Sequence, residues 1–174
     1  DLVEAWGYRC LDMVGFEADD IIGTLAKRWA SPDCHVWMIT GDKDFYQLID
    51  ENISILDLMK KREIKHEQVV ERFGVEPGRV IDVLGLAGDS SDNVPGVTGI
   101  GEKTAMKFVQ KYGSLEDVLA NADDVGGKRG LSLASEAEMA RLSKVLVTIK
   151  LDVPLALSLA DITAHERDVE TLRD

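Results

Sequence analysis

The short apolar run at residues 36–39 constrains the fold more than any other stretch, because two acids follow it at once. Thr40 and Gly41 form a turn, and Asp42 and Asp44 come next, just before a segment with helical spacing. In an open α/β sheet, functional groups gather beyond the carboxyl ends of the strands, so both carboxylates are expected there. Neighbouring carboxylates repel each other unless a cation joins them, and Mg²⁺ prefers such oxygen ligands. Taken alone, the stretch fits a polar turn with a helix cap equally well.

The first third of the sequence alternates helical and extended patterns, which is typical of an α/β fold with a partly parallel sheet and covering helices. Helical spacing predicts helices at residues 1–8, 18–30 and 45–49. Apolar runs predict extended segments at residues 9–14, 34–40 and 53–56, the last of which turns through a polar hairpin toward Ile64.

From His66 onward the pattern is helical and is divided by glycines. Gly74 and Gly113 are expected to end helices, and Ser114 is expected to cap the helix that follows it. The predicted helices are residues 66–73, 77–86, 102–112, 115–120 and 136–150. Residues 121–133 are expected to form a loop, and residues 153–159 an extended segment.

A chain of 174 residues is long enough for one domain or for a domain with a small appendage. Its formal net charge of −12 argues against a general basic surface for nucleic acid but is compatible with a local basic patch. Cys10 and Cys34 lack metal-ligand spacing and are expected to be buried thiols in a reducing compartment. No apolar run approaches the length of a membrane span, so we expect a soluble, cytoplasmic protein.

Clustered acids recur at the ends of three predicted elements. The groups are Glu17, Asp19 and Asp20; Asp42 and Asp44; and Asp89 and Asp92. A helix dipole favours acids in a first turn, so three unrelated caps are one interpretation. Their recurrence favours a shared metal site, and all-oxygen ligation indicates Mg²⁺ or Mn²⁺ rather than zinc. Two such ions roughly 4 Å apart suit the hydrolysis of a phosphodiester.

A glycine-rich turn at residues 95–105 opens a helix that carries lysines on one face. Gly99 and Gly101 let the backbone come close to a ligand, with N–H groups directed outward as an anion nest. Lysines recur four residues apart at Lys103, Lys107 and Lys111. The pattern favours binding of a nucleic-acid backbone over a tight interhelical turn with a solvated lysine stripe.

These motifs together resemble the 5′-to-3′ exonuclease domain of bacterial DNA polymerase I and the related flap endonucleases. The residues that match its acidic motifs are 15–20, 40–48 and 88–96. Residues 97–105 resemble the start of its helix-hairpin-helix variant, and residues 147–155 the segment that closes it. The resemblance runs through nearly the whole chain.

The resemblance implies a PIN-like α/β nuclease core at residues 1–65, a helix-hairpin-helix DNA-binding region at 66–150 and a closing segment at 151–174. It implies two-metal hydrolysis at DNA 5′ ends and 5′ flaps in replication and repair. Glu17, Asp19 and Asp20 would serve one metal, with Asp42 and Asp44 contributing there directly or through water. Asp89 and Asp92 would hold the second ion.

The same resemblance assigns the hairpin to duplex DNA, with a K⁺ ion bound in it. The residues that would contact DNA are Gly99, Ile100, Gly101, Lys103, Thr104 and Lys107. A covalently linked polymerase domain in the parent protein is a further partner that the resemblance leaves open.

The family pattern begins with a strand that carries a metal-binding Asp and with a basic helical arch, and neither precedes Gly15 here. We therefore expect this chain on its own to cut DNA slowly or not at all. A catalytically incomplete DNA-binding module is one alternative. A metal-dependent phosphatase built on Asp42 and Asp44 is another, which the hairpin disfavours because a small phosphoester needs no duplex clamp.

Overall fold

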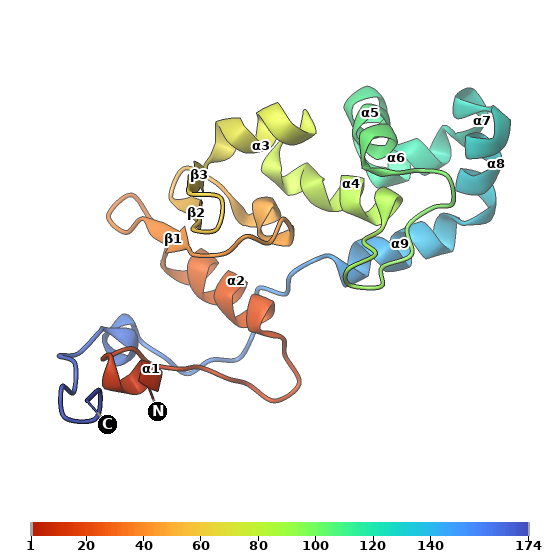
Figure 1. The fold of residues 1–174 in the computed structure, drawn as a ribbon. Coiled ribbons are helices and arrows are strands. Elements are labelled where there is room, and N and C mark those ends of the chain that lie inside the picture. The colour runs from red at the N-terminus through yellow and green to blue at the C-terminus, as the bar shows by residue number, and fades with distance from the viewer. Residues whose placement is uncertain (1, 174) are drawn as a thin grey trace. The chain divides into compact units, whose positions relative to one another are not determined.

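The structure is a computed structural model that describes residues 2–173, and its chain divides into two compact units (Figure 1). We call the first the terminal unit, which combines the chain up to Trp29 with the segment from Lys150 onward. We call the second, Ala30–Ile149, the central unit. Each is described by itself.

The terminal unit contains three short helical elements. They are α1 (Leu2–Ala5), α2 (Ala18–Trp29) and the 3₁₀ turn η3 (Leu159–Ile162). The unit's later segment, from Lys150 onward, has little regular secondary structure and returns to the early helices. The returning segment is held by hydrogen bonds from side chains of α2. Thr24 Oγ1 donates to the carbonyl of Lys150 (3.3 Å), and Arg28 Nη1 donates to that of Leu155 (2.8 Å).

Helix α2 confirms the helix expected at residues 18–30, and its charges follow the helix dipole. Asp19 and Asp20 lie in its first turn, and Lys27 and Arg28 in its last. One other expectation for this unit is wrong, since the helix predicted at residues 1–8 spans only Leu2–Ala5. The segments expected to be extended, residues 9–14 and 153–159, form no strand in the described part of the chain. Backbone groups at residues 153–155 bond to α2 side chains instead, so no strand partner is needed.

The central unit begins with a three-stranded mixed sheet of order β1-β2-β3. The strands are β1 (Val36–Met38), β2 (Ile53–Asp57) and β3 (Arg62–Ile64). β1 runs parallel to β2, and the 3₁₀ turn η1 (Asp44–Leu48) lies in the crossover between them. β3 returns antiparallel to β2 through the predicted hairpin. The sequence-based expectation of an α/β fold is confirmed.

The core of the sheet lies under η1. Ile53 and Ile55 of β2 are fully buried, and the aromatic rings of η1 cover the same face. Tyr46 meets Phe73 edge to face at 5.9 Å between ring centroids, a favourable aromatic geometry. This packing fixes the crossover that carries Asp42 and Asp44.

The rest of the central unit is helical. Its elements are α3 (His66–Phe73), the 3₁₀ turn η2 (Pro77–Arg79), α4 (Val80–Ala87), α5 (Glu102–Tyr112), α6 (Leu115–Ala120), α7 (Ala122–Val125), α8 (Gly127–Ser135) and α9 (Ala137–Leu146). Gly74 ends α3 in the left-handed region and Ser114 caps α6 by accepting from the Asp117 N–H, as predicted. The loop expected at residues 121–133 is wrong, because α7 and α8 occupy it.

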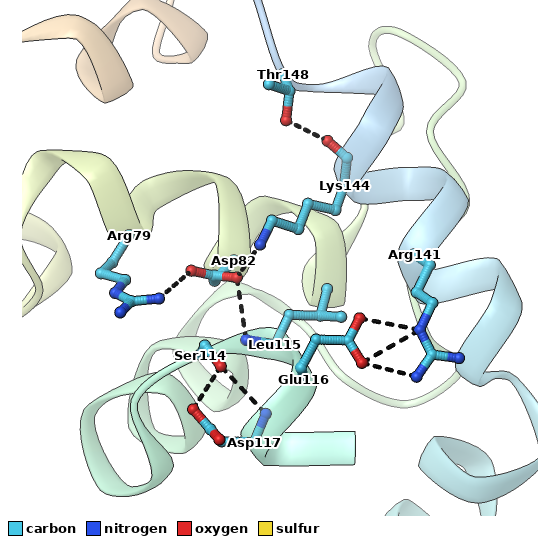
Figure 2. Close-up of polar contacts among 9 residues, drawn as sticks. All are labelled: Arg79, Asp82, Ser114, Leu115, Glu116, Asp117, Arg141, Lys144 and Thr148. Carbon is cyan, nitrogen blue, oxygen red and sulfur yellow. Dashed lines mark hydrogen bonds and ion pairs between the residues drawn. The ribbon is translucent and has the colours of Figure 1, made fainter. Parts of the chain in front are cut away.

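A buried carboxylate joins three of these helices (Figure 2). Asp82 of α4 accepts hydrogen bonds from Lys144 Nζ of α9 (2.7 Å) and from the Leu115 N–H of α6 (3.0 Å) through one oxygen. Its other oxygen lies 3.4 Å from Arg79 Nη1. We call these groups the Asp82 network. Both carboxylate oxygens are satisfied, so α4, α6 and α9 are tied to a common point.

Two smaller expectations can be compared with the structure. Cys10 and Cys34 are free thiols, but neither is buried, since Cys10 is exposed and Cys34 half-buried. Within residues 2–173, none of the helices combines the length and the apolar character that crossing a membrane requires.

Candidate metal and nucleic-acid site

The turn after β1 carries Asp42, Lys43 and Asp44. Thr40 Oγ1 accepts from the Asp42 N–H (3.1 Å), and Asp42 Oδ1 in turn accepts from the Asp44 N–H (2.9 Å). Asp42 therefore forms an Asx turn that leads into η1, which is the polar-turn role considered from the sequence. Asp44 differs, because its Oδ1 is buried and has no hydrogen-bond partner among the described residues.

Asp89 and Asp92 lie in a loop at residues 88–96 that closes on itself. The Asp89 and Val94 backbones exchange two hydrogen bonds of 2.9 and 2.7 Å. Gly88 (φ 72°) and Gly96 (φ 63°) meet at the neck of the loop, where a Cβ on Gly96 would lie 2.4 Å from the Gly88 nitrogen. Only glycine permits both this backbone conformation and this approach.

Lys43 joins the turn to the loop. Its Nζ lies 2.8 Å from Asp89 Oδ2, while Asp89 Oδ1 accepts from the Ser91 N–H (2.8 Å) and the Ser91 hydroxyl (2.5 Å). Burial disfavours the charged form of Asp89, but the hydrogen bonds from Lys43 and Ser91 outweigh it and lower the pKa of Asp89 to about 2. Burial also opposes the charge of Lys43, yet the contact with Asp89 raises the pKa of its amine. The pair is thus fully ionised.

Asp44 has the opposite environment. Burial, followed by the negative charges of Asp42 and Asp89, raises the pKa of Asp44 to about 7. One lysine therefore does not balance the negative charge that collects here. A carboxylate with a buried, unpartnered oxygen beside further carboxylates suits a hard divalent cation, which would supply the missing positive charge.

Asp42, Asp89 and Asp92 border a cavity of about 410 Å³, which we call the acid cavity. It is lined by Gly41, Asp42, Lys43, Lys60, Arg72, Asp89, Ser91 and Asp92. Within residues 2–173, no set of three or more His, Cys, Asp and Glu side chains has the arrangement of a metal cage. Lys43 occupies Oδ2 of Asp89 instead. Sequence reasoning missed Lys43, Lys60 and Arg72, although the lysine between two acids was a visible signal.

The first predicted acid group lies at the start of α2 in the terminal unit. Asp20 is nearly buried, and both of its oxygens accept backbone bonds, from the Lys150 N–H (2.8 Å) and the Glu17 N–H (3.3 Å). Asp20 therefore caps α2, the structural role considered from the sequence, and it also holds the returning chain, which the sequence did not predict. Glu17 is exposed and Asp19 half-buried beside it.

The hairpin brings together the groups predicted to contact nucleic acid. Ile100 is buried, so its side chain anchors the turn, and Thr104 is half-buried with its N–H bonded to the Gly101 carbonyl. Gly99 has φ 77° and accepts from Arg129 Nε (3.4 Å). Arg129 at the hairpin is another basic group that sequence reasoning missed.

The lysine stripe of α5 is shorter than predicted. Lys103 and Lys107 are exposed and form no ion pair with any residue in the described part of the chain. Lys111 is instead bound to Asp124 of α7 at 2.7 Å, because the helices in the segment expected to be a loop bring that acid alongside. Two of the three lysines are therefore available to a ligand.

A small mixed sheet with carboxylates beyond its parallel pair, followed by a glycine hairpin on a helical scaffold, defines a PIN-like α/β nuclease. Residues 1–74 match the 5′-3′ exonuclease N-terminal resolvase-like domain, and residues 75–170 match the 5′-3′ exonuclease C-terminal SAM fold. The chain belongs to the 5′-3′ exonuclease family, and the resemblance seen in the sequence motifs is confirmed.

Relatives by sequence are bacterial DNA polymerases. DNA polymerase I of Bacillus caldotenax is 41% identical over 176 residues, which cover 98% of this chain and 20% of that protein. DNA polymerase I of Rhizobium leguminosarum is 40% identical over 160 residues, covering 91% of this chain and 16% of that protein. The chain thus spans about a fifth of the length of the curated relatives it matches.

Similar solved structures include the 5′-exonuclease of bacteriophage T5 with bound zinc ions, at a TM-score of 0.69 and 26% identity. This match covers 79% of this chain and 51% of the phage protein. The phage T5 flap endonuclease in a pseudo-enzyme–product complex with DNA and metal ions matches at a TM-score of 0.67 and 25% identity, with the same coverage. Divalent-metal dependence is typical of this family of nucleases.

Proposed function

We propose that this chain is the nuclease portion of a larger DNA enzyme and serves to hydrolyse phosphodiesters at 5′ ends and 5′ flaps in replication and repair. The observation that carries the proposal is Asp44, which has a buried, unpartnered oxygen and feels the charges of Asp42 and Asp89, two acids that line the acid cavity. Three carboxylates from two loops meet in that cavity, and the hairpin proposed to bind phosphate follows in the chain.

The residues present fit two Mg²⁺ or Mn²⁺ ions. Asp89 and Asp92 would hold one, and Asp42 and Asp44 would contribute to the other. In the terminal unit, Glu17, Asp19 and Asp20 are proposed as metal ligands as well. The ions supply an activated water and neutralise charge on the leaving oxygen. The buried setting of Asp44 supports this assignment, because its carboxylate is costly to ionise without a cation.

Basic side chains of the acid cavity would orient the substrate. Lys60 and Arg72 line the cavity together with the carboxylates and carry exposed charge at its rim. A phosphate approaching the three acids of the cavity meets repulsion unless such groups offset it. Lys60 and Arg72 would take the non-bridging oxygens and hold the strand over the carboxylates.

The hairpin would grip duplex DNA by its backbone without reading sequence. Gly101 carries the argument, because its φ is ordinary (−89°) and a Cβ there would meet nothing within 4 Å. The fold does not require glycine at this position, so a closely approaching ligand accounts for it best. Lys103 and Lys107 would add phosphate contacts, with Gly99, Ile100 and Thr104 shaping the turn and a K⁺ ion bound to its carbonyls.

Residues 1–65 would then form the nuclease part, residues 66–150 the DNA-binding part and residues 151–174 the closing segment. A polymerase domain in the parent protein would be the covalent partner, since the relatives that match are DNA polymerase I. The work of such an enzyme places it in the bacterial cytoplasm with the nucleoid.

The nuclease proposal is tested with a 5′-labelled flap substrate and Mg²⁺, using the parent protein that contains this chain. Wild type should release 5′ products only with the metal, and Asp89→Asn with Asp92→Asn should lower the rate by several orders of magnitude, since both ligands of one ion are weakened. Ser90→Ala, next to these acids but exposed, is the matched control. Cleavage that persists in the double variant would contradict the assignment.

The hairpin proposal is tested by duplex binding at several salt concentrations. Gly101→Val should weaken binding by about tenfold because it blocks backbone approach, while the melting temperature stays close to that of wild type. Gly78→Val, another glycine with open space around it and far from the hairpin in sequence, is the control. Equal affinity of wild type and Gly101→Val at low salt would refute the hairpin's role.

A catalytically incomplete DNA-binding module is the second candidate, and two contacts favour it. Lys43 occupies Asp89 Oδ2, and backbone N–H groups occupy both oxygens of Asp20. Such a module would bind duplex through the hairpin yet take up no Mn²⁺ at the acid cavity. Calorimetric Mn²⁺ titration of wild type and of Asp42→Asn with Asp44→Asn decides between the two, because only the nuclease loses uptake in the variant.

A further inference from the structure

Lys43 has an unusual position, because it lies between two acids in sequence and against a third in space. Its Nζ is 2.8 Å from Asp89 Oδ2, and the charges of Asp44 and Glu102 also act on it. Its side chain keeps 27% of its surface exposed, while that of Asp89 keeps 5%. The carboxylate is therefore fixed, and the lysine approaches it from the open side.

The two oxygens of Asp89 have separate partners. Oδ1 accepts both hydrogen bonds from Ser91, which belongs to the same loop, and Oδ2 has Lys43 as its partner. Removing the amine would leave Asp89 in place, because the Ser91 bonds and the paired Asp89–Val94 backbone hold the loop. The oxygen released would face the acid cavity, which Lys43 and Asp89 both line.

We propose that Lys43 is a built-in cation that pairs with Asp89 Oδ2 in the metal-free protein and is displaced when a divalent ion enters the acid cavity. Lys43 thus competes with the ion for Asp89 Oδ2, while the Ser91 bonds hold the carboxylate in place. The inference rests on the proposed function, because it takes the acid cavity as the metal site.

Electrostatics favours an exchange over joint occupancy. A divalent ion bound to Asp89 Oδ2 would stand within a few ångströms of the ammonium, and like charges at that separation repel strongly in a partly buried site. Lysine has a flexible four-carbon stem and a strongly hydrated head, so it can move to water at modest cost. The rigid loop cannot yield in the same way.

Lys60 provides a matched comparison. It lines the same acid cavity, but its Nζ pairs at 3.6 Å with Asp57 of β2, which is not one of the cavity acids. Its removal takes away one positive charge from the cavity without freeing a ligand oxygen. Comparing variants at Lys43 and Lys60 therefore distinguishes competition for a ligand oxygen from the general effect of removing a positive charge.

The first test measures Mn²⁺ affinity by calorimetry at pH 7 and moderate salt, using the whole 174-residue chain. Lys43→Met should bind Mn²⁺ about tenfold more tightly than wild type, since the ion no longer breaks a charge-assisted bond. The Mn²⁺ affinity of Lys60→Met should stay within about twofold of wild type, because the exposed charge of Lys60 acts on the ion only through screening solvent. Lys43→Arg, which keeps the pair, should bind no more tightly than wild type.

The second test follows the amine directly by brief acetylation and mass spectrometry. Saturating Mn²⁺ should raise the modification of Lys43 several-fold, because a displaced amine meets the reagent, while the modification of Lys60 stays constant. The reading does not depend on any variant folding. Circular dichroism of Lys43→Met confirms that the variant used for calorimetry is folded.

The outcomes separate this inference from the proposed function. Mn²⁺ uptake that Asp42→Asn with Asp44→Asn abolishes, but that Lys43→Met leaves equal or weaker, overturns the inference alone. The same holds if Mn²⁺ leaves the reactivity of Lys43 unchanged or lowers it. Absence of Mn²⁺ uptake by both wild type and Lys43→Met overturns the metal site and the inference together.

Discussion

Asp82 and Asp89 are both buried carboxylates held by a lysine, at 2.7 Å from Lys144 and 2.8 Å from Lys43. Their surroundings differ. Asp82 also accepts from the Leu115 N–H and lies near Arg79, so both of its carboxylate oxygens have a donor partner (Figure 2). Asp89 shares its cavity with Asp42 and Asp92, so its lysine faces an excess of negative charge.

The comparison teaches that a lysine–carboxylate pair does not reveal its role by its own geometry. The Asp82 network lies among helices, where its loss would leave an uncompensated buried charge. The Lys43–Asp89 pair lies at a cavity, where another cation can take the place of the lysine. The role follows from what else surrounds the carboxylate.

Asp82→Ala should have the largest effect on stability. The substitution leaves Lys144 partly buried without its partner and removes the acceptor for the Leu115 N–H, so we expect a loss of roughly 3–5 kcal/mol in the free energy of unfolding. Urea denaturation measures it. Arg79→Ala, at the more exposed end of the network, should cost less than about 1 kcal/mol. If Asp82→Ala lowers the free energy of unfolding no more than Arg79→Ala does, the structural role assigned to Asp82 is wrong.

Asp89→Asn should cost less in the metal-free protein, about 2 kcal/mol, because it keeps the shape and the Ser91 contacts and loses the charge. The pKa of Asp89 is lowered to about 2, so its contribution is present above the unfolded value near 4 and is lost as the pH falls through 2. Unfolding measured from pH 5 to pH 2 should show this loss in wild type. The variant should be flatter over the same range, and parallel curves would contradict the assignment.

His66→Gln should have the smallest effect, because the His66–Glu76 pair is exposed on both sides. The hydrogen bond to Glu76 raises the pKa of His66, so the stabilisation is present below about pH 6.5 and is lost as the pH rises through the folded value. The difference in melting temperature between wild type and variant should be about one degree or less at pH 5.5 and vanish at pH 8.5. A larger shift in melting temperature would show that side-chain exposure does not determine how much each of these pairs contributes to stability.

Local signals in the sequence were enough for much of the fold. The Ser114 cap, the glycines that end α3 and α5, and the polar turn between β2 and β3 all act within a few residues. The segment expected to be extended at residues 9–14 forms no strand, because an apolar run becomes a strand only beside a partner. The loop expected at residues 121–133 is wrong, because α7 and α8 pack closely there. Gly130 allows this packing, since a Cβ there would lie 2.4 Å from the Ala122 carbonyl oxygen.

The candidate site divides in the same way. The spacing of acids pointed to Asp42, Asp44, Asp89 and Asp92, because clustering is visible in one dimension. The partners of acids were not visible, since Lys43 meets Asp89 and Lys150 meets Asp20 across long stretches of chain. Charge balance at a site is a property of the folded chain, and sequence patterns give only one side of it.

The closed loop at residues 88–96 joins the acid cavity rigidly to the hairpin. The backbones of Gly88 and Gly96 approach each other closely, so the ends of the loop are fixed. The Gly96 N–H also donates to Ser143 Oγ of α9 at 3.0 Å. The hairpin begins at the next residue, so a phosphate held there would stand at a fixed distance from Asp89 and Asp92. Neither surface can be lengthened, shortened or re-aimed without disturbing the other, and inserted residues in this loop should be tolerated far less than in the exposed turns of the same chain.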